Sequence, residues 1–548
     1  MMYYRDLKLT YPDRRDWTLP AVLRDRSRTH GDRVYVQVPD QGVELTYAQT
    51  LDVAERIGGG LLAGGCVPGD RVLIMAPNRL EYLTAWFGAS VAGLVEVPIN
   101  NAYSGSFLEH QVGTVDPRAA VVHTDFVDRF LELDAARRSI RTFYVVGDGP
   151  SVETAVSVLR DAGWQAAPFT ALADSPRPAT LPAVGMSDLA AILFTSGTTG
   201  LSKGVMMPHA HMYFFADECV SLTRLTETDV YMSVGPLFHG NAQFLAAYPA
   251  LIAGARFVLQ TKFSASRWVD QLRASQATVT NFVGVMMDWV YKQPRRADDA
   301  DNQLRCLYAV PAATSILADF RERFAIEAFV ENFGLTEIAM PILTPYGLER
   351  PPGAAGLLVD DYFDVRLVDP ETDEEVPVGE VGELVVRAKL PWTMCSGYYN
   401  MPDRTLEAQR NLWFHTGDGL RRDADGWYYF VDRLKDSLRR RGENISSFEV
   451  EQPILAHPAV AECTVVAVPA DAEAGEDELL LVVVRQDGLE LTAEELWDWC
   501  ALKLPAFTVP RYIRFADELP LTPSGKVRKG ELRRAGVDAL TADRESRP

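Results

Sequence analysis

The sequence predicts an α/β protein that ends in a smaller α+β region. Short apolar runs alternate with amphipathic stretches over most of the chain, which is typical of sheets covered by helices. From about residue 364 the pattern changes to paired strands with turn residues between them. The length of 548 residues, at roughly 150 residues per domain, predicts two to four structural units, and 47% apolar residues can fill more than one core.

The first part of the chain contains short apolar runs bounded by turn or charged residues. The predicted strands are residues 71–76 (RVLIMA), 94–98 (LVEVP), 119–123 (AAVVH), 141–146 (RTFYVV) and 189–194 (LAAILF). Residues 83–92 (LTAWFGASVA) predict a helix that is buried on all sides, because nearly every position is small or apolar.

The region after residue 360 is predicted to form antiparallel strands. Residues 364–369 (DVRLVD) and 382–388 (GELVVRA) flank the acidic turn 370–375 (PETDEE), which predicts a β-meander. Residues 423–426 (DADG) and the WYYFVDR that follows predict another hairpin.

The C-terminal region is a smaller α+β pattern. Ser446 and Glu449 form a candidate capping box for a helix that stops near residue 457, and residues 463–468 predict a strand. The last eight residues, TADRESRP, predict disorder. We therefore divide the chain into a domain of residues 1–431, a hinge at 432–435 and a C-terminal domain of residues 436–548.

Composition argues against several classes of protein. The 54 basic and 75 acidic residues give a formal net charge of −21, unlike proteins that coat nucleic acid or bind membranes through a basic patch. The six cysteines contain no Cys-x-x-Cys pair, and no apolar run approaches the about 18 residues of a membrane span. The N-terminal MMYYRDLKLT lacks the apolar core of a signal peptide, so we expect a cytoplasmic enzyme.

The strongest local signal is residues 193–204, LFTSGTTGLSKG. A strand leads into a loop whose glycines, hydroxyls and lysine can turn backbone N–H groups and positive charge towards a phosphate. A Walker A loop is excluded by the spacing, and an ordinary surface loop is the alternative. The candidate phosphate-binding residues are Thr195, Ser196, Gly197, Thr198, Thr199, Gly200 and Lys203.

This loop resembles the phosphate-binding loop of the acyl-adenylate-forming (AMP-binding) superfamily, although Ser202 stands where that family usually has proline. Four further strings resemble the family's motifs in the family's order. They are residues 332–337 (NFGLTE), 416–418 (TGD), 432–436 (DRLKD) and 522–526 (TPSGK). The resemblance covers nearly the whole chain and implies a large N-terminal domain, with two helix-flanked sheets and a distorted β-barrel, and a small mobile C-terminal domain.

The resemblance also implies how a nucleotide is bound. Asn332, Phe333 and Gly334 would form the adenine site, with Phe333 stacked on the base. Thr336 would bind the α-phosphate, and Glu337 would hold Mg²⁺. For the sugar, Asp418 would accept hydrogen bonds from both ribose hydroxyls, and Arg433 would reach the ribose or the phosphates.

The resemblance implies that two lysines act in the catalytic cycle. Lys435 would be the pivot about which the C-terminal domain rotates between two half-reactions. Lys526 would bridge the carboxylate of the acid and the α-phosphate during the first of them.

Residues 439–449 (RRRGENISSFE) resemble the surface that coenzyme A ligases use in the second step. Gly442 would line the tunnel for the pantetheine arm, because a side chain would narrow it. Arg439 and its neighbours would contact the phosphates of CoA. The alternative, to which we give equal weight, is that these arginines form a basic strand edge that only contacts solvent.

The acid would bind in a pocket whose residues are taken from family positions. The candidates are Phe282, Val283, Gly284, Met286, Tyr308, Val310, Pro311 and Ile338. The stretch 308–313 (YAVPAA) lacks the Gly-Gly pair common in the family, so Val310 and Pro311 would reshape the pocket. None of these side chains is charged, which favours a small or medium acid that is apolar or aromatic.

Histidines offer two further hypotheses. His239 resembles the histidine at the mouth of the family's acyl pocket, where it would gate the pocket or orient the carboxylate; a core histidine is the alternative. His209 and His211 are a weak candidate for a metal pair, because alternate residues share a face only on a strand.

Together these residues predict a ligase of the acyl-CoA synthetase, carnitine-CoA-ligase-like branch. It would use ATP and Mg²⁺ to convert an acid to acyl-AMP and then transfer the acyl group to coenzyme A. We expect no nucleic-acid partner and no membrane span, and we expect a homodimer. An enzyme that passes the activated group to an amine or a carrier-protein thiol, or that activates an oxyanion such as nitrite, is the alternative. An inactive nucleotide-binding relative is the non-enzyme alternative.

Overall fold

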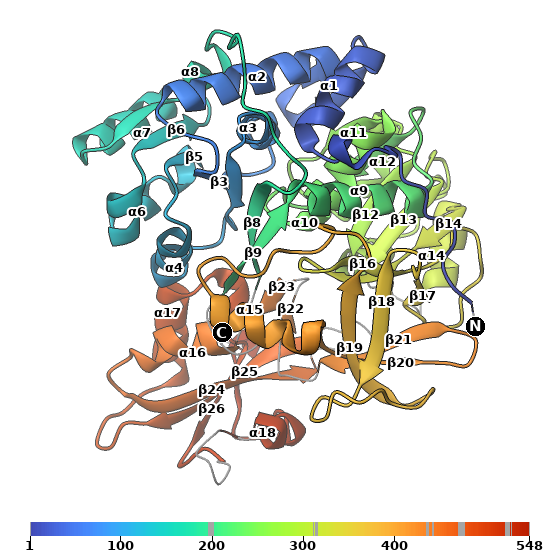
Figure 1. The fold of residues 1–548 in the computed structure, drawn as a ribbon. Coiled ribbons are helices and arrows are strands. Elements are labelled where there is room, and N and C mark those ends of the chain that lie inside the picture. Colours follow the sequence, from blue (N-terminus) through green and yellow to red (C-terminus); the bar gives the residue numbers. More distant parts are fainter. Residues whose placement is uncertain are drawn as a thin grey trace. The chain divides into compact units, whose positions relative to one another are not determined.

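The computed structural model describes residues 2–195, 202–310, 312, 316–433, 438–440, 443–445, 447–469, 477–520, 527 and 529–546 (Figure 1). The chain divides into two compact units. The first contains Met1–Asn101, Val112–Leu193 and Gly204–Asp432, and the second contains Ala102–Gln111, Phe194–Lys203 and Arg433–Pro548. The hinge predicted at 432–435 stays a prediction, and Lys435 lies outside the described residues.

The first sheet has seven strands in the order β7-β6-β5-β3-β4-β8-β9. The strands are β3 (Arg71–Met75), β4 (Val95–Pro98), β5 (Ala119–His123), β6 (Thr142–Val146), β7 (Gln165–Pro168), β8 (Leu189–Thr195) and β9 (Lys203–Pro208). Pairing from β7 to β8 is parallel, so both faces are covered and the strands are almost wholly apolar. All five strands predicted from apolar runs are confirmed here to within one residue.

The predicted buried helix is α3 (Leu80–Val91), in which every residue from Tyr82 onward is buried. It packs against α2 (Tyr47–Ala63) (Figure 1). A Cβ added to Gly88 of α3 would lie 2.3 Å from Ile57 Cγ2, so this close approach of the two helices requires glycine.

The second sheet has the order β14-β13-β12-β10-β11-β1-β2. Its strands are β1 (Val34–Val38), β2 (Val43–Thr46), β10 (Val230–Ser233), β11 (Arg256–Leu259), β12 (Val279–Val283), β13 (Cys306–Val310) and β14 (Ala328–Val330). All pairs are parallel except β1 with β2. The carboxyl ends of β10, β12 and β13 therefore meet at one edge, which is where ligands bind in sheets of this kind.

The third sheet is antiparallel, in the order β15-β16-β17-β21-β20-β19-β18. Its strands are β15 (Asn332–Leu335), β16 (Ala339–Leu343), β17 (Gly356–Leu358), β18 (Phe363–Val368), β19 (Val381–Ala388), β20 (Phe414–Arg422) and β21 (Trp427–Arg433). The predicted meander is β18 and β19, and the predicted DADG turn joins β20 to β21, so both predictions are confirmed. This sheet is the part of the fold for which a distorted barrel was expected.

The second unit contains a four-stranded sheet, β24-β25-β26-β27, and the hairpin β22–β23. Its strands are β22 (Leu438–Arg440), β23 (Glu443–Ile445), β24 (Val460–Pro469), β25 (Asp477–Arg485), β26 (Tyr512–Ala516) and β27 (Ala542–Asp543), and its helices are α16 (Ser447–Leu455), α17 (Ala493–Lys503) and α18 (Lys529–Ala535). The prediction that the last eight residues are disordered is wrong for β27. This strand pairs with β26, and Asp543 accepts two hydrogen bonds from Arg511.

The remaining helices belong to the N-terminal part of the chain. They are α1 (Leu19–His30), α4 (Gly105–Val115), α5 (Asp128–Leu131), α6 (Asp134–Ser139), α7 (Pro150–Asp161), α8 (Thr170–Ala173), α9 (His209–Thr223), α10 (Gly240–Ala242), α11 (Tyr248–Ala253), α12 (Trp268–Ser275), α13 (Gly284–Tyr291), α14 (Leu317–Phe324) and α15 (Pro402–Ala408). Among the described residues, no helix combines the length and apolar character needed to cross a membrane.

All six cysteines are buried and none forms a disulfide. Burial raises the pKa of the Cys66 thiol to about 11 and the pKa values of Cys306 and Cys500 to about 12. These three thiols are therefore protonated at neutral pH and behave as small apolar core groups.

Glu96 places a carboxyl group inside the core. It lies in β4, is 1% exposed, and its Oε1 accepts a hydrogen bond of 2.8 Å from Gln243 Nε2. Burial raises the pKa of Glu96 to about 8, although the hydrogen bond from Gln243 works against that rise. Gln243 begins the π-helix Gln243–Ala247, so this carboxyl group links the first sheet to the segment that follows α10.

Titration of Glu96 predicts a pH dependence of stability. Between the ordinary pKa of 4.5 and about 8, the folded chain keeps a proton that the unfolded chain loses, so stability falls as pH rises through this range. Glu96→Gln removes this titration. We expect the variant to lose less stability than the wild type between about pH 5 and pH 8, by on the order of a few kcal/mol.

Thermal and denaturant unfolding at a series of pH values measure this effect. Glu153→Gln, on the exposed face of α7, is the matched control and should follow the wild type. Parallel pH profiles for the wild type and Glu96→Gln would contradict the assignment.

Candidate active site

The NFGLTE motif forms a hairpin. Asn332, Phe333 and Gly334 lie in β15, and Thr336 and Glu337 lie in the turn before β16. A Cβ added to Gly334 would lie 2.2 Å from the carbonyl oxygen of Ala339, so only glycine permits the two strands to approach this closely. Thr336 and Glu337 therefore lie in a tight turn between two strands.

Glu337 is held by the segment that precedes α15. The hydroxyl of Tyr398 donates a hydrogen bond of 3.0 Å to Glu337 Oε1, and the N–H of Cys395 donates to the backbone carbonyl of Glu337 at 2.9 Å. Glu337 is 7% exposed, so its carboxylate is fixed in a protected position. Tyr398 lies 61 residues away, outside the five motifs, so no signal in the sequence places it beside Glu337.

The same segment is bonded to β9, the strand that begins at Lys203. Ser396 N donates to Met206 O and Met206 N donates to Gly397 O, both at 2.9 Å. Tyr399 N donates to Gly204 O at 2.8 Å. Residues 395–399 therefore connect the turn of Glu337 to the strand that follows the predicted phosphate-binding loop. This connection could not be predicted from the sequence alone.

Within the loop itself, the structure describes only its two ends. Thr195 is the last residue of β8 and Lys203 is the first of β9. Ser196, Gly197, Thr198, Thr199 and Gly200 lie outside the described residues. Ser202, the position that departs from the family pattern, is 4% exposed.

The predicted adenine site has polar and aromatic neighbours. Asn332 is 7% exposed, and its Oδ1 accepts a hydrogen bond from the hydroxyl of Tyr308, which also contacts Met340 Sδ at 3.2 Å. Phe333 stacks near Phe430 of β21, with ring centroids 6.3 Å apart. Phe430 is 48% exposed, and no signal in the sequence assigned it to this site.

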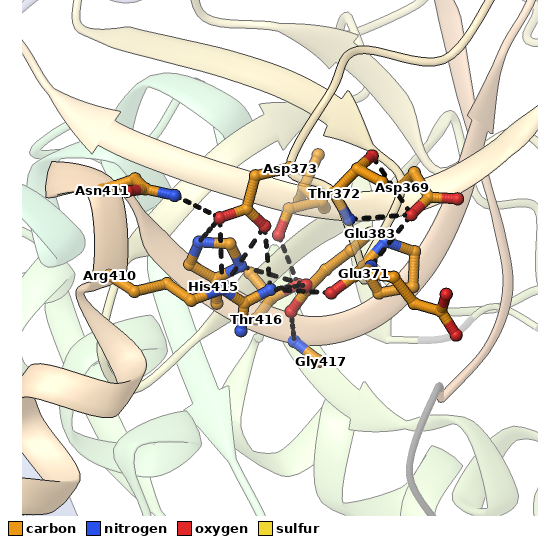
Figure 2. A network of polar contacts seen from close by, with 12 residues as sticks. Asp369, Glu371, Thr372, Asp373, Glu383, Arg410, Asn411, His415, Thr416 and Gly417 are labelled. Atoms are coloured by element: carbon orange, nitrogen blue, oxygen red, sulfur yellow. Dashed lines mark hydrogen bonds and ion pairs between the residues drawn. The ribbon is translucent and has the colours of Figure 1, made fainter.

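Asp418 lies in β20, where the pairing with β19 changes register. It is 1% exposed, and its backbone N–H donates to Thr416 Oγ1 at 3.1 Å. The neighbouring Gly417 N–H donates to Glu383 Oε1 at 2.9 Å, within a network of polar side chains (Figure 2). None of the sequence signals identified Glu383 as part of this site.

Several predicted acyl-pocket residues lie at the ends of adjacent strands or soon after them, but the candidates do not all lie on the same face of the second sheet. Val283 and Val310 pair across β12 and β13, and His239 follows β10 as the residue before α10. Tyr308 and Ile338 belong to the largest core cluster. Phe282 instead belongs to another core cluster, where its ring lies 5.0 Å from that of Trp268, so it is not brought together with Tyr308.

The other pocket candidates are less completely described. Gly284 and Met286 lie in the first turn of α13, where Met286 is half-buried, and Pro311 is outside the described residues. Arg433 ends β21 and Arg439 lies in β22, but the description does not extend to their side chains. Lys435, Gly442 and Lys526 also lie outside it.

Three other polar residues, His209, His211 and Lys529, have surroundings that favour a structural role. His209 and His211 are buried in α9, and burial lowers their pKa values to about 4 and about 3. No group of three or more metal-ligating side chains occurs among the described residues. Lys529, the lysine nearest to Lys526, is tied to Glu451 Oε1 at 2.8 Å and to Ser447 Oγ at 2.5 Å, which is a structural role within the second unit.

Comparison with known proteins adds two family matches. Residues 23–399 match the model described as AMP-binding enzyme, and residues 449–526 match the AMP-binding enzyme C-terminal domain. The chain is 34% identical over 502 residues to a feruloyl-CoA synthase from Amycolatopsis sp, covering 90% of this chain and 94% of that protein.

It is also 30% identical over 499 residues to a crotonobetaine/carnitine–CoA ligase from Salmonella agona (strain SL483), covering 89% and 93%. Among solved structures, apo MatB from Rhodopseudomonas palustris is 28% identical and has a TM-score of 0.66, covering 95% of this chain and 98% of that one.

Proposed function

The chain belongs to the family of AMP-binding enzymes, and from that premise we propose that it is an AMP-forming acid–CoA ligase. It activates a carboxylic acid with ATP to acyl-AMP and then transfers the acyl group to coenzyme A. The observation that carries the proposal is the segment of residues 395–399, which is bonded to both the Thr336–Glu337 turn and β9. That segment joins the motif assigned to the α-phosphate to the strand that follows the phosphate loop.

The chemistry explains why such a site needs several polar groups. A carboxylate is a poor electrophile, because direct substitution would have to expel oxide. Attack of its oxygen on the α-phosphorus of ATP forms a C–O–P bond and releases pyrophosphate, so the acyl group gains AMP as a leaving group. Two anions must meet in this step, and in our proposal the loop donors, Thr336 and Lys526 orient them and offset their charge.

Magnesium fits the donor set at Glu337. A buried carboxylate oxygen is a ligand of the kind that a hard divalent cation prefers, and Tyr398 holds the carboxylate in place. Mg²⁺ bound there would neutralise part of the triphosphate charge. Thr336, beside Glu337 in the same turn, would then hold the α-phosphate by its hydroxyl.

Nucleotide binding and transfer to CoA use separate groups in this proposal. Phe333 stacks on adenine, Asp418 accepts from the ribose hydroxyls, and Arg433 reaches the ribose or the phosphates. Rotation about Lys435 then brings Arg439 and Gly442 to CoA for attack by its thiol. Because ATP and CoA are cytoplasmic co-substrates, we also propose that the enzyme acts in the cytoplasm. We propose further that it forms a homodimer.

The acid is proposed to be aromatic or apolar rather than cationic. The pocket candidates Tyr308, Val310 and Ile338 carry no charge. The nearby carboxyl of Glu218 accepts a hydrogen bond from Met340 N at 3.1 Å, and burial raises its pKa well above the ordinary value, which disfavours the charged form that would attract a quaternary ammonium. An acid of the feruloyl type therefore fits better than one of the carnitine type.

A pyrophosphate-release screen over aromatic, aliphatic and betaine acids, with and without CoA, tests the function. Release that requires an acid, with thioester formed only when CoA is present, is the expected result. A product that requires an amine in place of CoA would support amide formation, and release with nitrite would support activation of an oxyanion. No acid-dependent release with any acceptor would contradict the proposal.

Glu337→Gln tests the proposed magnesium ligand. The amide keeps the size of the side chain but removes the anionic oxygen, so we expect a higher Mg²⁺ concentration for half-maximal adenylation and a rate lowered by about tenfold or more. Titration of adenylation with Mg²⁺ measures both effects. Tyr398→Phe keeps the carboxylate and should give a smaller shift; an unchanged Mg²⁺ dependence in Glu337→Gln would count against the assignment.

Lys526→Ala tests the separation of the two half-reactions. Removal of a preorganised charge from the transition state costs about 10²–10³ in rate, so adenylation should be nearly abolished. Thioester formation from presynthesised acyl-AMP should persist, because the lysine acts only in the first step. Lys503→Ala, on the exposed face of α17, is the control and should leave both steps unchanged. Adenylation by Lys526→Ala at near wild-type rate would show that Lys526 is not the catalytic lysine.

A further inference from the structure

The loop of Asp418 is a bulge in the third sheet. Glu383 of β19 pairs with Gly419 of β20, and Val385 pairs with His415, so a two-residue step on β19 faces a four-residue step on β20. The three residues of β20 between these pairs are the Thr-Gly-Asp motif, and they face the single residue Leu384 of β19. Gly417 has a φ of +73°, in the left-handed region that favours glycine. Bulges redirect side chains next to active sites, and this one sets the direction of Asp418.

Glu383 holds the bulge through both carboxylate oxygens. Its Oε1 accepts the hydrogen bond from Gly417 N–H, and its Oε2 lies 3.0 Å from His415 Nδ1 (Figure 2). Arg410 also donates to Oε2, at 3.3 Å. The side chain is 6% exposed, so these contacts replace water that the carboxylate loses on folding.

A second carboxylate supports the partners of Glu383. Asp373 accepts from Arg410 at 2.9 Å and from Asn411, and its Oδ2 lies 3.9 Å from His415 Nε2 (Figure 2). Burial by itself raises the pKa of Glu383, but hydrogen bonds from His415 and Gly417 and the charge of Arg410 bring it below the ordinary value. Glu383 is therefore ionised at neutral pH and remains a strong acceptor.

Thr416 also supports the bulge, through hydrogen bonds to β19 and to Asp418. Its hydroxyl donates to Leu384 O at 2.7 Å and accepts from the backbone N–H of Asp418 at 3.1 Å. Thr416 and Gly417 are thus tied to β19 at two adjacent positions, Leu384 and Glu383, and Asp418 is tied to Thr416. Such bracing restricts the backbone from which the Asp418 carboxylate projects.

We propose that Glu383 is a positioning residue for nucleotide recognition, which orients Asp418 towards the ribose hydroxyls by holding the bulge of residues 416–418. The inference rests on the proposed function, since it takes Asp418 as the ribose acceptor. It adds that the choice between ribose and deoxyribose depends on a carboxylate that does not itself touch the nucleotide. A merely stabilising role would instead weaken binding of both kinds of nucleotide alike.

Binding of ATP, 2′-deoxyATP and 3′-deoxyATP to the full chain, by calorimetry with Mg²⁺, tests this without knowledge of the acid. The wild type should prefer ATP by about tenfold or more, because a hydrogen bond to a charged acceptor is lost in each deoxynucleotide. In Glu383→Ala this preference should fall by about fivefold or more, because ATP loses both hydrogen bonds to Asp418 whereas each deoxynucleotide has only one to lose. Glu383→Gln keeps an acceptor for Gly417 N–H and should restore most of the preference.

Two further variants keep the test decisive. Thr416→Val removes the other brace and should lower the preference for ATP in the same way, even if Glu383→Ala fails to fold. Glu371→Ala, an exposed glutamate in the turn between β18 and β19, is the matched control and should bind all three nucleotides as the wild type does.

The possible outcomes separate the two proposals. An unchanged preference for ATP in Glu383→Ala and Thr416→Val, or an equal loss of affinity for all three nucleotides, would overturn the role of Glu383 and leave the ligase proposal standing. A wild-type chain that binds no ATP would overturn both.

Discussion

The backbone pairing of residues 395–399 is the interaction on which the first unit's site depends. This segment has no regular secondary structure, yet its N–H and carbonyl groups bond β9 of the first sheet, and its Cys395 and Tyr398 bond the turn of the third sheet. Gly397 permits the path: its φ is +106°, and an added Cβ would lie 2.5 Å from Thr405 Cγ2. This connection holds Glu337 directly against the strand that follows the phosphate loop.

The sequence predicted the strands of the first sheet well because parallel strands are buried on both faces. Burial makes each strand an uninterrupted apolar run, which is a local signal, as at residues 71–75 and 119–123. Motif residues such as Asp418 and Glu337 could also be proposed from the sequence, since each belongs to a short string with a fixed order. Their supports were not: Tyr398 lies 61 residues from Glu337, and Glu383 lies 34 residues from Gly417. Such partners are joined only by tertiary folding and leave no local pattern.

The same limit explains the error at the C-terminal tail. The last residues are polar and charged, which in isolation predicts disorder. Their order comes from Arg511, 32 residues earlier, which donates two hydrogen bonds to Asp543 and pairs with Glu545 at 2.9 Å. Tertiary structure also limits what the composition says about charge. The formal charge of −21 counts Glu96 and Glu218 as ionised, although burial raises the pKa values of both carboxyl groups and so disfavours their charged forms.

The burial of all six cysteines has a chemical consequence for an enzyme that makes a mixed anhydride. Acyl-AMP reacts with any accessible thiolate, and a surface cysteine near the site would compete with CoA and end as a dead-end thioester on the protein. Thiols such as Cys306, with a pKa raised to about 12 by burial, offer neither the access nor the charge for that attack. The described fold therefore protects the catalyst from acylation by its own intermediate, and leaves the incoming thiol of CoA without a rival from the chain's cysteines.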